Sequence, residues 1–545
     1  MKICSASLSS WQPGEMPGDR SRCTEARKRA DRPVSCDEHL HAYGQATRSL
    51  HGCFGDSKQL CPPALCQGAD EAVIAVPAIA ATDSESERNA KEQTMTANLE
   101  KYRTLGGWVE KPADLRSELE RDETADVVIV GAGFAGLSAA LELARRGAKV
   151  VILEREFAGF GASGRNAGYL AGAMGLEYDL FLKGVGAETG KKIVRYYEEA
   201  VPFVERKLEE HGIQCDYVQS GIIRAGIHPS QEKKVREDMR IGAELGLQSE
   251  FLDHAQMRAR GIPPAFLFGN YVPRGGTLNP GKYVMGLRRA ALLAGVEIFE
   301  NTPLVSYTAG SVVNLKTPRG SVSAPLVMFA TNAYTPQLGL LGDKVVPLRV
   351  SAIETEPLSP SQLSALGWPR REGIVTPHWI MESHRLTADN TVLVTTKRIH
   401  YAYGSETPNV PDDVAYRALR VALRDRFPML GNQPLRACWS GYISFANDAL
   451  PVVGVTGPQQ NIYYSAGCSG HGVASQSMVG HMIAEQMCGI DNSLLSGISH
   501  ETPSTLPEPL RWCAINGALA ATNSMDGWVN RKARAALARR TGRHA

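Results

Sequence analysis

The stretch DVVIVGAGFAGLSAALELARRGAKVVILER, Asp126–Arg155, carries the pattern that decides the fold. Its start, Asp126–Val130, is an apolar run of strand length, and Gly136–Arg146 then repeats apolar residues at helical spacing until Gly147. A second apolar run follows at Lys149–Leu153. Strand, helix and strand in this order are typical of the first unit of a parallel α/β sheet.

Three glycines occupy the turn between the first strand and the helix. Gly131 permits a tight turn, Gly133 lets the backbone approach a pyrophosphate, and Gly136 lets the helix pack against the strand. The helix N-terminus offers free amides and a partial positive charge to this anion. Glu154 ends the second strand, where a carboxylate accepts hydrogen bonds from ribose and repels the 2′-phosphate of NADP. The stretch therefore predicts a dinucleotide site and leaves FAD and NAD open.

A second glycine-rich segment, GFGASGRNAGYL at Gly159–Leu170, follows the second strand. A NAD-binding domain would normally continue here into another regular strand–helix unit. A loop containing Ser163, Arg165 and Asn166 instead suits a longer cofactor, whose second phosphate and distal ring need further polar contacts. The segment favours FAD, and a flexible loop without a ligand is the alternative.

Composition excludes several classes of protein. The chain has 545 residues, a net charge of +2 and 43% hydrophobic residues, which gives no general attraction to nucleic acid. No run approaches the roughly 20 apolar residues of a membrane span, and the N-terminus lacks the apolar core of a secretory signal. The 11 cysteines form no dense framework and match no zinc pattern. We therefore expect a cytoplasmic protein without a metal, a membrane span or a nucleic-acid partner.

The patterns along the chain indicate a nucleotide-binding domain interrupted twice by a second domain. Pro280–Ala294 repeats the helical pattern, Val296–Glu300 follows as a strand, and Ser311–Lys316 with Val322–Ala330 resembles a hairpin. Charged helical and strand-rich segments lie between these pieces. The expected division is a disordered extension at 1–94, an FAD-binding domain at 95–190, 272–345 and 430–500, a substrate domain at 191–271 and 346–429, and a C-terminal tail at 501–545.

Several distal motifs accompany the two glycine-rich segments. They are FATNAY at Phe329–Tyr334, RLTADN at Arg385–Asn390, WSGYISFANDALPVVG at Trp439–Gly454 and NIYYSAGCSGHGV at Asn461–Val473. With these motifs in this order, the chain resembles the D-amino-acid-oxidase-type FAD-dependent oxidoreductases, and within them the gamma-glutamylputrescine oxidase branch. The resemblance implies an α/β fold, with a Rossmann-like FAD-binding domain assembled from discontinuous segments and an α+β substrate domain with a mixed sheet.

The resemblance also implies contacts with FAD, which we expect to be bound non-covalently. The residues expected to contact it are Gly131, Ala132, Gly133, Phe134, Ala135, Gly136, Glu154, Arg155, Ser163, Gly164, Arg165, Asn166, Ala167, Val305, Ser469, Gly470, His471, Gly472 and Val473. Val305 is expected at the adenine, and Ser469–Val473 at the flavin ring. Because Gly470 and Gly472 lack side chains, the amides at the start of the following helix can approach the ring and stabilise negative charge on it.

The implied reaction is oxidation of a C–N bond in an amine to an imine and then an aldehyde, with oxygen reduced to hydrogen peroxide. Amino-acid oxidases of this kind often carry an arginine after W-x-G, whereas Trp439-Ser440-Gly441 is followed by Tyr442 and Ile443, which favours an amine. The alternative is a D-amino-acid or secondary-amine dehydrogenase that passes electrons to a quinone. Further candidates for contact with substrate are Tyr169, His384, Arg385 and Lys397, and no catalytic side chain or oligomeric state is indicated.

Overall fold

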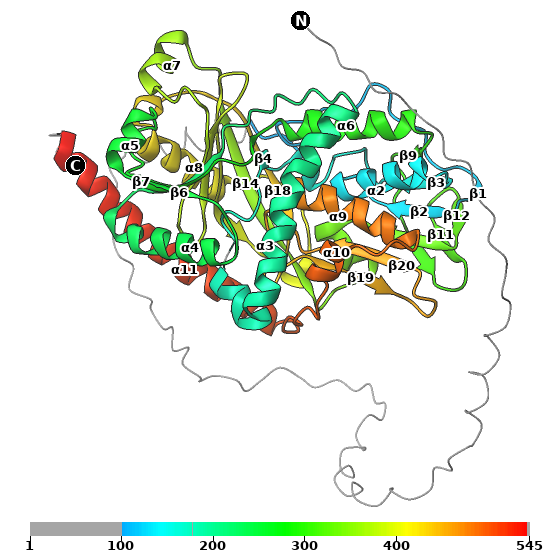
Figure 1. Ribbon diagram of the computed structural model, residues 1–545. Coiled ribbons are helices and arrows are strands. Elements are labelled where there is room, and N and C mark those ends of the chain that lie inside the picture. The colour runs from blue at the N-terminus through cyan, green and yellow to red at the C-terminus, as the bar shows by residue number, and fades with distance from the viewer. Residues whose placement is uncertain (1–100, 177, 542–545) are drawn as a thin grey trace, which may run out of the picture. The chain divides into compact units, whose positions relative to one another are not determined.

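A six-stranded sheet contains the two strands predicted around the glycine-rich turn. The computed structural model describes residues 101–176 and 178–541 (Figure 1), and the extension expected at 1–94 lies outside them. The strand order is β19 (Val452–Thr456), β20 (Ile462–Ala466), β13 (Leu326–Phe329), β2 (Val127–Val130), β3 (Val150–Leu153) and β9 (Glu297–Phe299). Only β19 runs antiparallel to its neighbour. β2 and β3 are buried along their whole length, as expected for apolar strands covered on both faces.

Helix α2 (Phe134–Arg145) follows the glycine-rich turn and packs against β2 and β3. The helices α6 (Pro280–Leu293) and α9 (Gly472–Met487) pack against α2, and Figure 1 shows α9 beside it. α6 begins where the sequence predicts, because the Asn279 side chain accepts a hydrogen bond from the Lys282 amide and Pro280 occupies the first turn. Segments far apart in the sequence therefore build one parallel sheet with its helices.

The second large sheet is mixed and has eight strands. Its order is β18 (Leu435–Ala446), β14 (Val345–Thr355), β17 (Val392–His400), β16 (Glu382–Leu386), β15 (Gly373–Val375), β5 (Ile222–Gly226), β7 (Phe268–Val272) and β6 (Glu250–Leu252). Only β15 and β5 pair in parallel. The helices of this part of the chain are α4 (Glu232–Glu244), α5 (His254–Ala259), α7 (Pro360–Leu366) and α8 (Asp413–Arg426). The predicted fold class is confirmed.

Two boundaries differ from the sequence-based expectations. β18 lies in the segment 430–500, expected in the FAD-binding domain, but it pairs along its length with β14 in the eight-stranded sheet. Val322–Ala330, expected as one strand of a hairpin, is divided at Pro325. The first part, β12 (Ser321–Ala324), pairs with β11 (Val313–Lys316), whereas β13 joins the six-stranded sheet. A proline cannot donate a ladder hydrogen bond, so it separates the two strands.

Two small sheets, two more α-helices and five 3₁₀ helices lie among the remaining described segments before residue 501. β12 and β11 form a four-stranded sheet with β1 (Asp122–Thr124) and β10 (Ser306–Thr308), and β4 (Tyr169–Leu170) pairs with β8 (Gly276–Thr277). The long helix α3 (Tyr178–Glu210), interrupted at Gly186, packs against α9 and α10 (Ser493–Ile498). The 3₁₀ helices are η1 (Ala162–Gly164), η2 (Pro229–Gln231), η3 (Asn332–Leu338), η4 (Tyr403–Ser405) and η5 (Pro428–Leu430).

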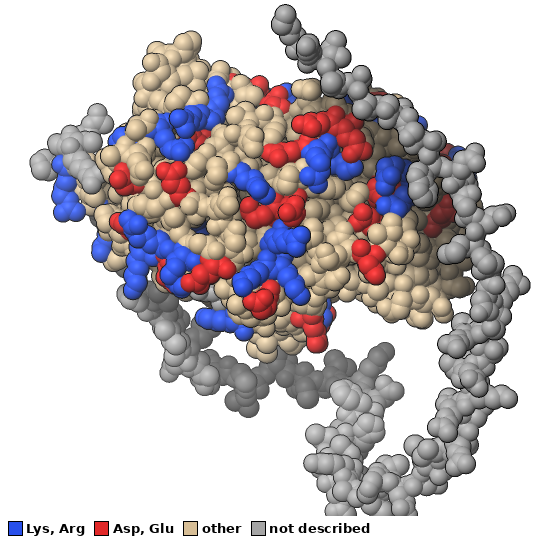
Figure 2. All heavy atoms as spheres, viewed as in Figure 1, with Lys and Arg blue, Asp and Glu red and all other residues tan. Residues whose placement is uncertain are grey.

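The segment 501–545, expected as a C-terminal tail, contains the long helix α11 (Leu510–Thr541), shown in red in Figure 1. It packs against β17, and Val529 and Ala533 contact the core on that side. Across the described helices, none is both long and apolar enough to cross a membrane. On the face shown in Figure 2, acidic and basic side chains are interspersed, as expected from the near-zero net charge.

Candidate active site

A cavity of about 200 Å³ lies at the carboxyl ends of β2, β3 and β13. Gly131, Glu154 and Thr331, which follow these three strands, line it together with Ser163 of the second glycine-rich loop. Gly472, at the start of α9, lines it as well. Ligands of open α/β sheets bind at this position, outside the carboxyl ends of parallel strands. The fold thus brings the two glycine-rich segments and the distal SGHGV motif to one cavity.

The geometry of the first turn requires its glycines. Gly131 has a φ of 102°, and a Cβ there would lie 2.9 Å from the carbonyl oxygen of Ala330. A Cβ at Gly136 would lie 2.1 Å from the carbonyl oxygen of Gly131, so any side chain would push the helix away from the turn. At Gly133 the nearest atom would be Oγ of Ser163, at 2.9 Å. The turn and the second glycine-rich loop therefore approach each other closely.

Glu154 ties the turn to the end of β3. Its Oε2 accepts a hydrogen bond from the Ala132 amide at 2.8 Å, and its Oε1 accepts one from the Glu156 amide at 3.0 Å. Burial raises the pKa of this carboxyl group, and the two amide bonds oppose that shift. The carboxylate lines the cavity and has acceptor capacity left for ribose hydroxyls.

Two tryptophans hold the backbone of the loop Gly159–Gly168. Trp439 donates its indole N–H to the carbonyl of Arg165 at 2.9 Å, and Trp108 donates to the carbonyl of Asn166 at 2.7 Å. The two indole rings pack edge to face, with their centroids 6.0 Å apart. The loop is therefore fixed by residues from β18 and from the segment before β1.

Arg385, on β16, holds the same loop from the eight-stranded sheet. Its Nη1 lies 2.7–3.0 Å from the carbonyl oxygens of Ala167, Gly168 and Leu278. Burial lowers the pKa of this guanidinium to about 10, so the group remains charged at neutral pH. Arg385 thus joins the substrate-side sheet to the glycine-rich loop.

A larger cavity, of about 480 Å³, shares Asn166, Ile443, Gly470 and Val473 with the first and therefore adjoins it. It extends between the loop that contains Arg165, strands of the eight-stranded sheet and helix α11. Most of its lining side chains are apolar. Such a combination of an apolar cavity with a few polar groups is typical of a small-molecule site.

Helix α9 begins with its first amides at these cavities. His471 is the N-cap residue, and its side chain makes no capping hydrogen bond. Gly470 has a φ of 88°, and a Cβ there would meet no atom within 4 Å. The imidazole ring of His471 lies instead beside Tyr197, with Nε2 3.3 Å from the carbonyl oxygen of Met174. The helix therefore presents backbone amides with a partial positive charge, which favour a negatively charged group.

Two buried polar atoms that line the smaller cavity have no hydrogen-bond partner among the described residues. They are Oδ1 of Asn332 and Nε2 of Gln476, an acceptor and a donor. Their other amide atoms are bound, because Asn332 Nδ2 donates to Cys468 Sγ at 3.3 Å and Gln476 Oε1 accepts from Ser465 at 2.8 Å. Buried polar atoms are normally paired. These atoms, the glycine turn and Glu154 fit a long ligand with phosphates, ribose and a polar ring, such as FAD.

Comparison with known proteins decides the family. The family described as "FAD dependent oxidoreductase" (DAO) matches residues 126–486. The chain belongs to this family. It is an enzyme, an oxidoreductase with FAD as its cofactor.

Individual relatives agree with this assignment. The oxidoreductase is 30% identical over 383 residues to the probable oxidoreductase OrdL of Haemophilus influenzae, covering 69% of this chain and 86% of the relative. It is 31% identical over 382 residues to gamma-glutamylputrescine oxidoreductase of Escherichia coli, covering 68% and 85%. Glycine oxidase from Geobacillus kaustophilus shares the fold, with a TM-score of 0.59, 19% identity and coverage of 70% of this chain and 100% of that chain. The predicted resemblance is confirmed.

Most residues predicted to contact FAD line one of the two cavities of the oxidoreductase. They are Gly131, Gly133, Phe134, Ala135, Glu154, Arg155, Ser163, Arg165, Asn166, Ala167, Ser469, Gly470, His471, Gly472 and Val473. Ala132, Gly136 and Gly164 line neither cavity and shape the backbone nearby. Val305 is 65% exposed and its amide donates to the carbonyl of Lys316, whereas residues 302–304 line the cavity. The contact of Val305 with adenine stays a prediction.

Of the four residues predicted to contact substrate, only Tyr169 lines one of the two cavities described. His384, Arg385 and Lys397 line neither cavity. Lys397 and His384 lie against the buried carboxylate of Glu382, and Arg385 holds the glycine-rich loop. Tyr169 lines the larger cavity, but its hydroxyl lies 3.1 and 2.8 Å from backbone carbonyl oxygens on β15 and β16. His384, Arg385 and Lys397 therefore contact other parts of the protein, and contact of Tyr169 with substrate stays a prediction.

Two lining residues, Asn332 and Gln476, and one residue that holds the glycine-rich loop, Trp108, were not predicted from the sequence. Asn332 lies inside the FATNAY motif, which gave a usable signal because an asparagine that follows an apolar strand at the sheet edge is well placed to contact a ligand. Gln476, in the first turns of α9, looked like an ordinary helix residue. Trp108 follows two glycines upstream of the fingerprint, where no periodic element was expected.

We expect acid denaturation of the holoenzyme to leave the yellow flavin in the supernatant. In the described part of the chain, Cys468 is the cysteine that lines a cavity, and its Sγ already accepts from Asn332. Cys438, on β18, is buried, and its burial raises the pKa of the thiol to about 12, so it is a poor nucleophile. The measurement is absorbance of supernatant and pellet after precipitation. Yellow pellets from the wild type but not from Cys468→Ser would contradict this expectation.

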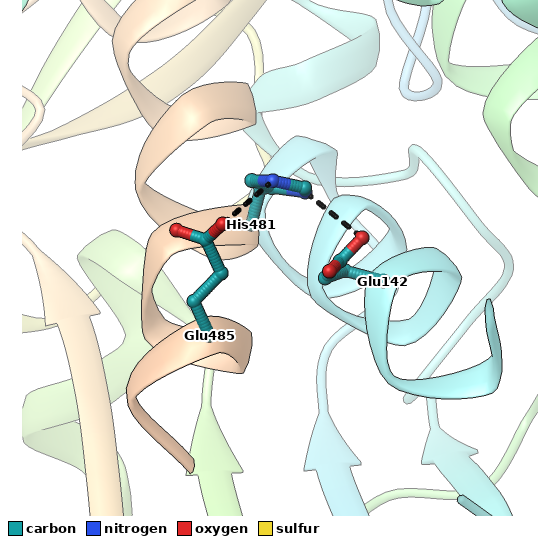
Figure 3. A group of neighbouring side chains, drawn as sticks. All are labelled: Glu142, His481 and Glu485. Atoms are coloured by element: carbon teal, nitrogen blue, oxygen red, sulfur yellow. Dashed lines mark ion pairs between the residues drawn. The ribbon is translucent and has the colours of Figure 1, made fainter. Parts of the chain in front are cut away.

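A group of ionisable side chains joins α2 to α9 on the side of these helices shown in Figure 3. His481 lies between two carboxylates, with Nδ1 3.5 Å from Glu142 and Nε2 3.5 Å from Glu485. Arg145 and Arg146 also donate to the carboxylate of Glu142, at 2.7 and 2.6 Å. Two guanidinium groups at this carboxylate repel a cation. We therefore interpret the group as an ion-pair network between the helices.

Glu142→Gln is expected to lower the free energy of unfolding more at pH 7 than at pH 4. Burial opposes ionisation of Glu142, but the arginines and His481 outweigh it and lower the pKa of the carboxyl from 4.5 to about 2. The charge therefore stabilises the folded state above about pH 4.5, and the effect is lost as the pH falls towards 2. Urea unfolding at both pH values measures it. Glu244→Gln, at an exposed ion pair, is the control and should change little at either pH. A Glu142→Gln effect equal at both pH values would contradict the assignment.

Proposed function

We propose that this oxidoreductase oxidises the C–N bond of an amine, such as gamma-glutamylputrescine or a related amine, to an imine that water hydrolyses to an aldehyde, and that oxygen is reduced to hydrogen peroxide. The proposal rests on one observation: the two described arginines that line the larger cavity are already bound to other groups of the protein. Arg165 donates to the carbonyls of Phe160 and Ser440, and Arg224 pairs with Asp238 at 2.9 Å.

Among the described residues that line the larger cavity, both arginines already have partners in the protein. An α-carboxylate would therefore have no free guanidinium group to bind. The position after Trp439-Ser440-Gly441 supports the same interpretation, because Ile443 lines the cavity there. An amino acid would have to bury its carboxylate against apolar side chains, which is costly for an unpaired charge. An amine without an adjacent carboxylate avoids this cost.

When bound, FAD would accept the hydrogen and electron pair of the C–H bond next to the nitrogen, while the nitrogen gives up a proton to water and the C–N bond becomes the imine double bond. The protein supplies the surroundings. The apolar lining of the larger cavity disfavours an ammonium ion and so favours the neutral amine, which carries the lone pair that the reaction needs. The amides of Gly472 and Val473, at the start of α9, would stabilise negative charge on the bound flavin. These contributions do not require a side-chain base.

The test is anaerobic titration of the holoenzyme with gamma-glutamylputrescine, putrescine, sarcosine, glycine and D-alanine, followed by flavin absorbance. Amines with no carboxylate on the carbon that is oxidised, such as putrescine and the putrescine end of gamma-glutamylputrescine, should bleach the flavin. Bleaching by D-alanine while both diamines fail would favour the alternative function, a D-amino-acid or secondary-amine dehydrogenase. Comparison of peroxide formation with dye reduction then separates an oxidase from a dehydrogenase that feeds a quinone.

A further inference from the structure

Helix α11 forms one wall of the larger cavity. Ile515, Ala518, Leu519 and Thr522 line it, and their spacing places them on a single face of the helix. The family match ends at residue 486, before this helix begins at Leu510. The shape of the cavity on this side is therefore set by a segment outside the part of the chain that defines the family.

The surroundings of this helix face are apolar. Ile515 packs with Val346, Leu348, Ile399 and Phe445 of the eight-stranded sheet, and all five line the cavity. The arginines that line the cavity belong to other walls, in the loop after β3 and on β5. A ligand group that reaches this wall meets hydrocarbon side chains and the Thr522 hydroxyl, and among the described residues of the wall no carboxylate, ammonium or guanidinium group.

The helix is fixed next to the cavity by buried polar contacts. The carboxylate of Asp526 accepts hydrogen bonds from the amides of Trp379 at 3.0 Å and Ile380 at 2.8 Å, and these two residues line the same cavity. Asn530, one turn further, accepts from Arg426, whose guanidinium also binds Glu382. Asp526 and Asn530 are both buried. The wall is therefore held in one position relative to the sheet and is not a loosely attached end of the chain.

We propose that α11 determines substrate specificity, and that Ile515, Ala518 and Leu519 bind an uncharged alkyl or aryl group of the amine beyond the reacting nitrogen. The inference rests on the proposed oxidation of an amine, and it narrows the substrate class to amines with an apolar substituent. A γ-glutamyl group, which carries a carboxylate and an ammonium ion, is then a poorer ligand for this end of the cavity.

The experiment uses the holoenzyme and n-alkylamines from propylamine to octylamine, with gamma-glutamylputrescine as the charged comparison. Calorimetry gives the Kd of each amine under anaerobic conditions, and flavin bleaching gives its rate of oxidation. For each methylene that reaches the wall, we expect about a fourfold gain in affinity. We expect gamma-glutamylputrescine to bind more weakly than octylamine.

Leu519→Ala removes part of the wall, and Leu510→Ala is the matched control. Leu510 lies on the same helix, is 58% exposed and does not line the cavity. Leu519→Ala should weaken octylamine binding about tenfold and leave propylamine binding unchanged, whereas Leu510→Ala should change neither. Ala518→Leu should weaken binding of the longest amines by narrowing the same end.

The two proposals fail in different ways. If amines bleach the flavin but affinity does not rise with chain length, or if Leu519→Ala affects propylamine and octylamine equally, the role of α11 is wrong and the amine oxidation stands. If affinity rises with chain length and depends on Leu519 but no amine bleaches the flavin, the proposed function is wrong and the apolar wall stands. If no amine either binds or bleaches, both are wrong.

Discussion

Gly470→Leu is expected to yield an oxidoreductase that folds but no longer retains FAD. The Cβ of residue 470 would meet no protein atom within 4 Å, and the residue lines both cavities, so a larger side chain there extends into the space of the cofactor. Excluding the flavin from the α9 amides should raise the Kd for FAD about 100-fold. The measurements are the flavin content of the purified protein and fluorescence titration of the apoprotein with FAD.

A matched glycine separates the effect on the cofactor from backbone strain. Gly489, at the other end of α9, has a φ of 75°, close to the 88° of Gly470, and a Cβ there would also meet no atom within 4 Å. It lines neither cavity. Both leucine variants therefore pay about 1 kcal/mol for a left-handed residue, and only Gly470→Leu should lose FAD. Equal FAD affinity in the two variants would contradict the placement of the flavin at the start of α9.

Arg385→Leu is expected to lower both the stability and the FAD affinity of the enzyme. The substitution leaves three backbone carbonyls without the donor that now holds them, at a cost of at least about 3 kcal/mol. Because Ala167 and Gly168 line the larger cavity, their displacement should also weaken FAD binding at least tenfold. Urea unfolding of the apoprotein and FAD titration measure the two effects separately.

Two control variants test whether the loss of FAD affinity comes from displacement of the loop or only from removal of a buried charge. Arg385→Lys keeps the positive charge with a single nitrogen and should recover part of both quantities. Arg426→Leu removes another buried arginine, which binds Glu382 and Asn530 and does not contact the loop, so it should lower stability while FAD affinity is kept. Full FAD affinity in Arg385→Leu would show that the loop holds its position without this residue.

The parts of the fold that depend on neighbouring residues were predictable from the sequence. Gly131 and Gly136 are required by contacts within a single turn, and the helix and strands around them follow from local apolar spacing. Glu154 could be assigned in the same way, because it stands directly at the end of a strand, whereas the role of the distal glycines was implied by the family resemblance. Their convergence on one cavity follows from the parallel sheet, whose strands all point their carboxyl ends to one edge.

The parts that depend on distant partners were not predictable. Lys397 was a candidate for contact with substrate, but its partner Glu382 lies on a neighbouring strand, and nothing in the sequence indicates that pairing. Arg385 looked like a ligand for substrate because its carbonyl acceptors lie in a loop more than 200 residues earlier. The segment 430–500 was expected in the FAD-binding domain for the same reason, since the sequence of the apolar strand β18 does not indicate that it pairs with β14.

The hydrogen bonds from Arg385 and Trp439 to the second glycine-rich loop have a consequence for chimeric enzymes. Both donors belong to the eight-stranded sheet, and the carbonyls that they hold belong to the loop after β3. A chimera that takes its substrate-binding half from one relative and its nucleotide-binding half from another would therefore lose the support of the loop at the join. Exchange of specificity between members of the family should succeed only when the loop Gly159–Gly168 is transplanted together with the sheet that holds it.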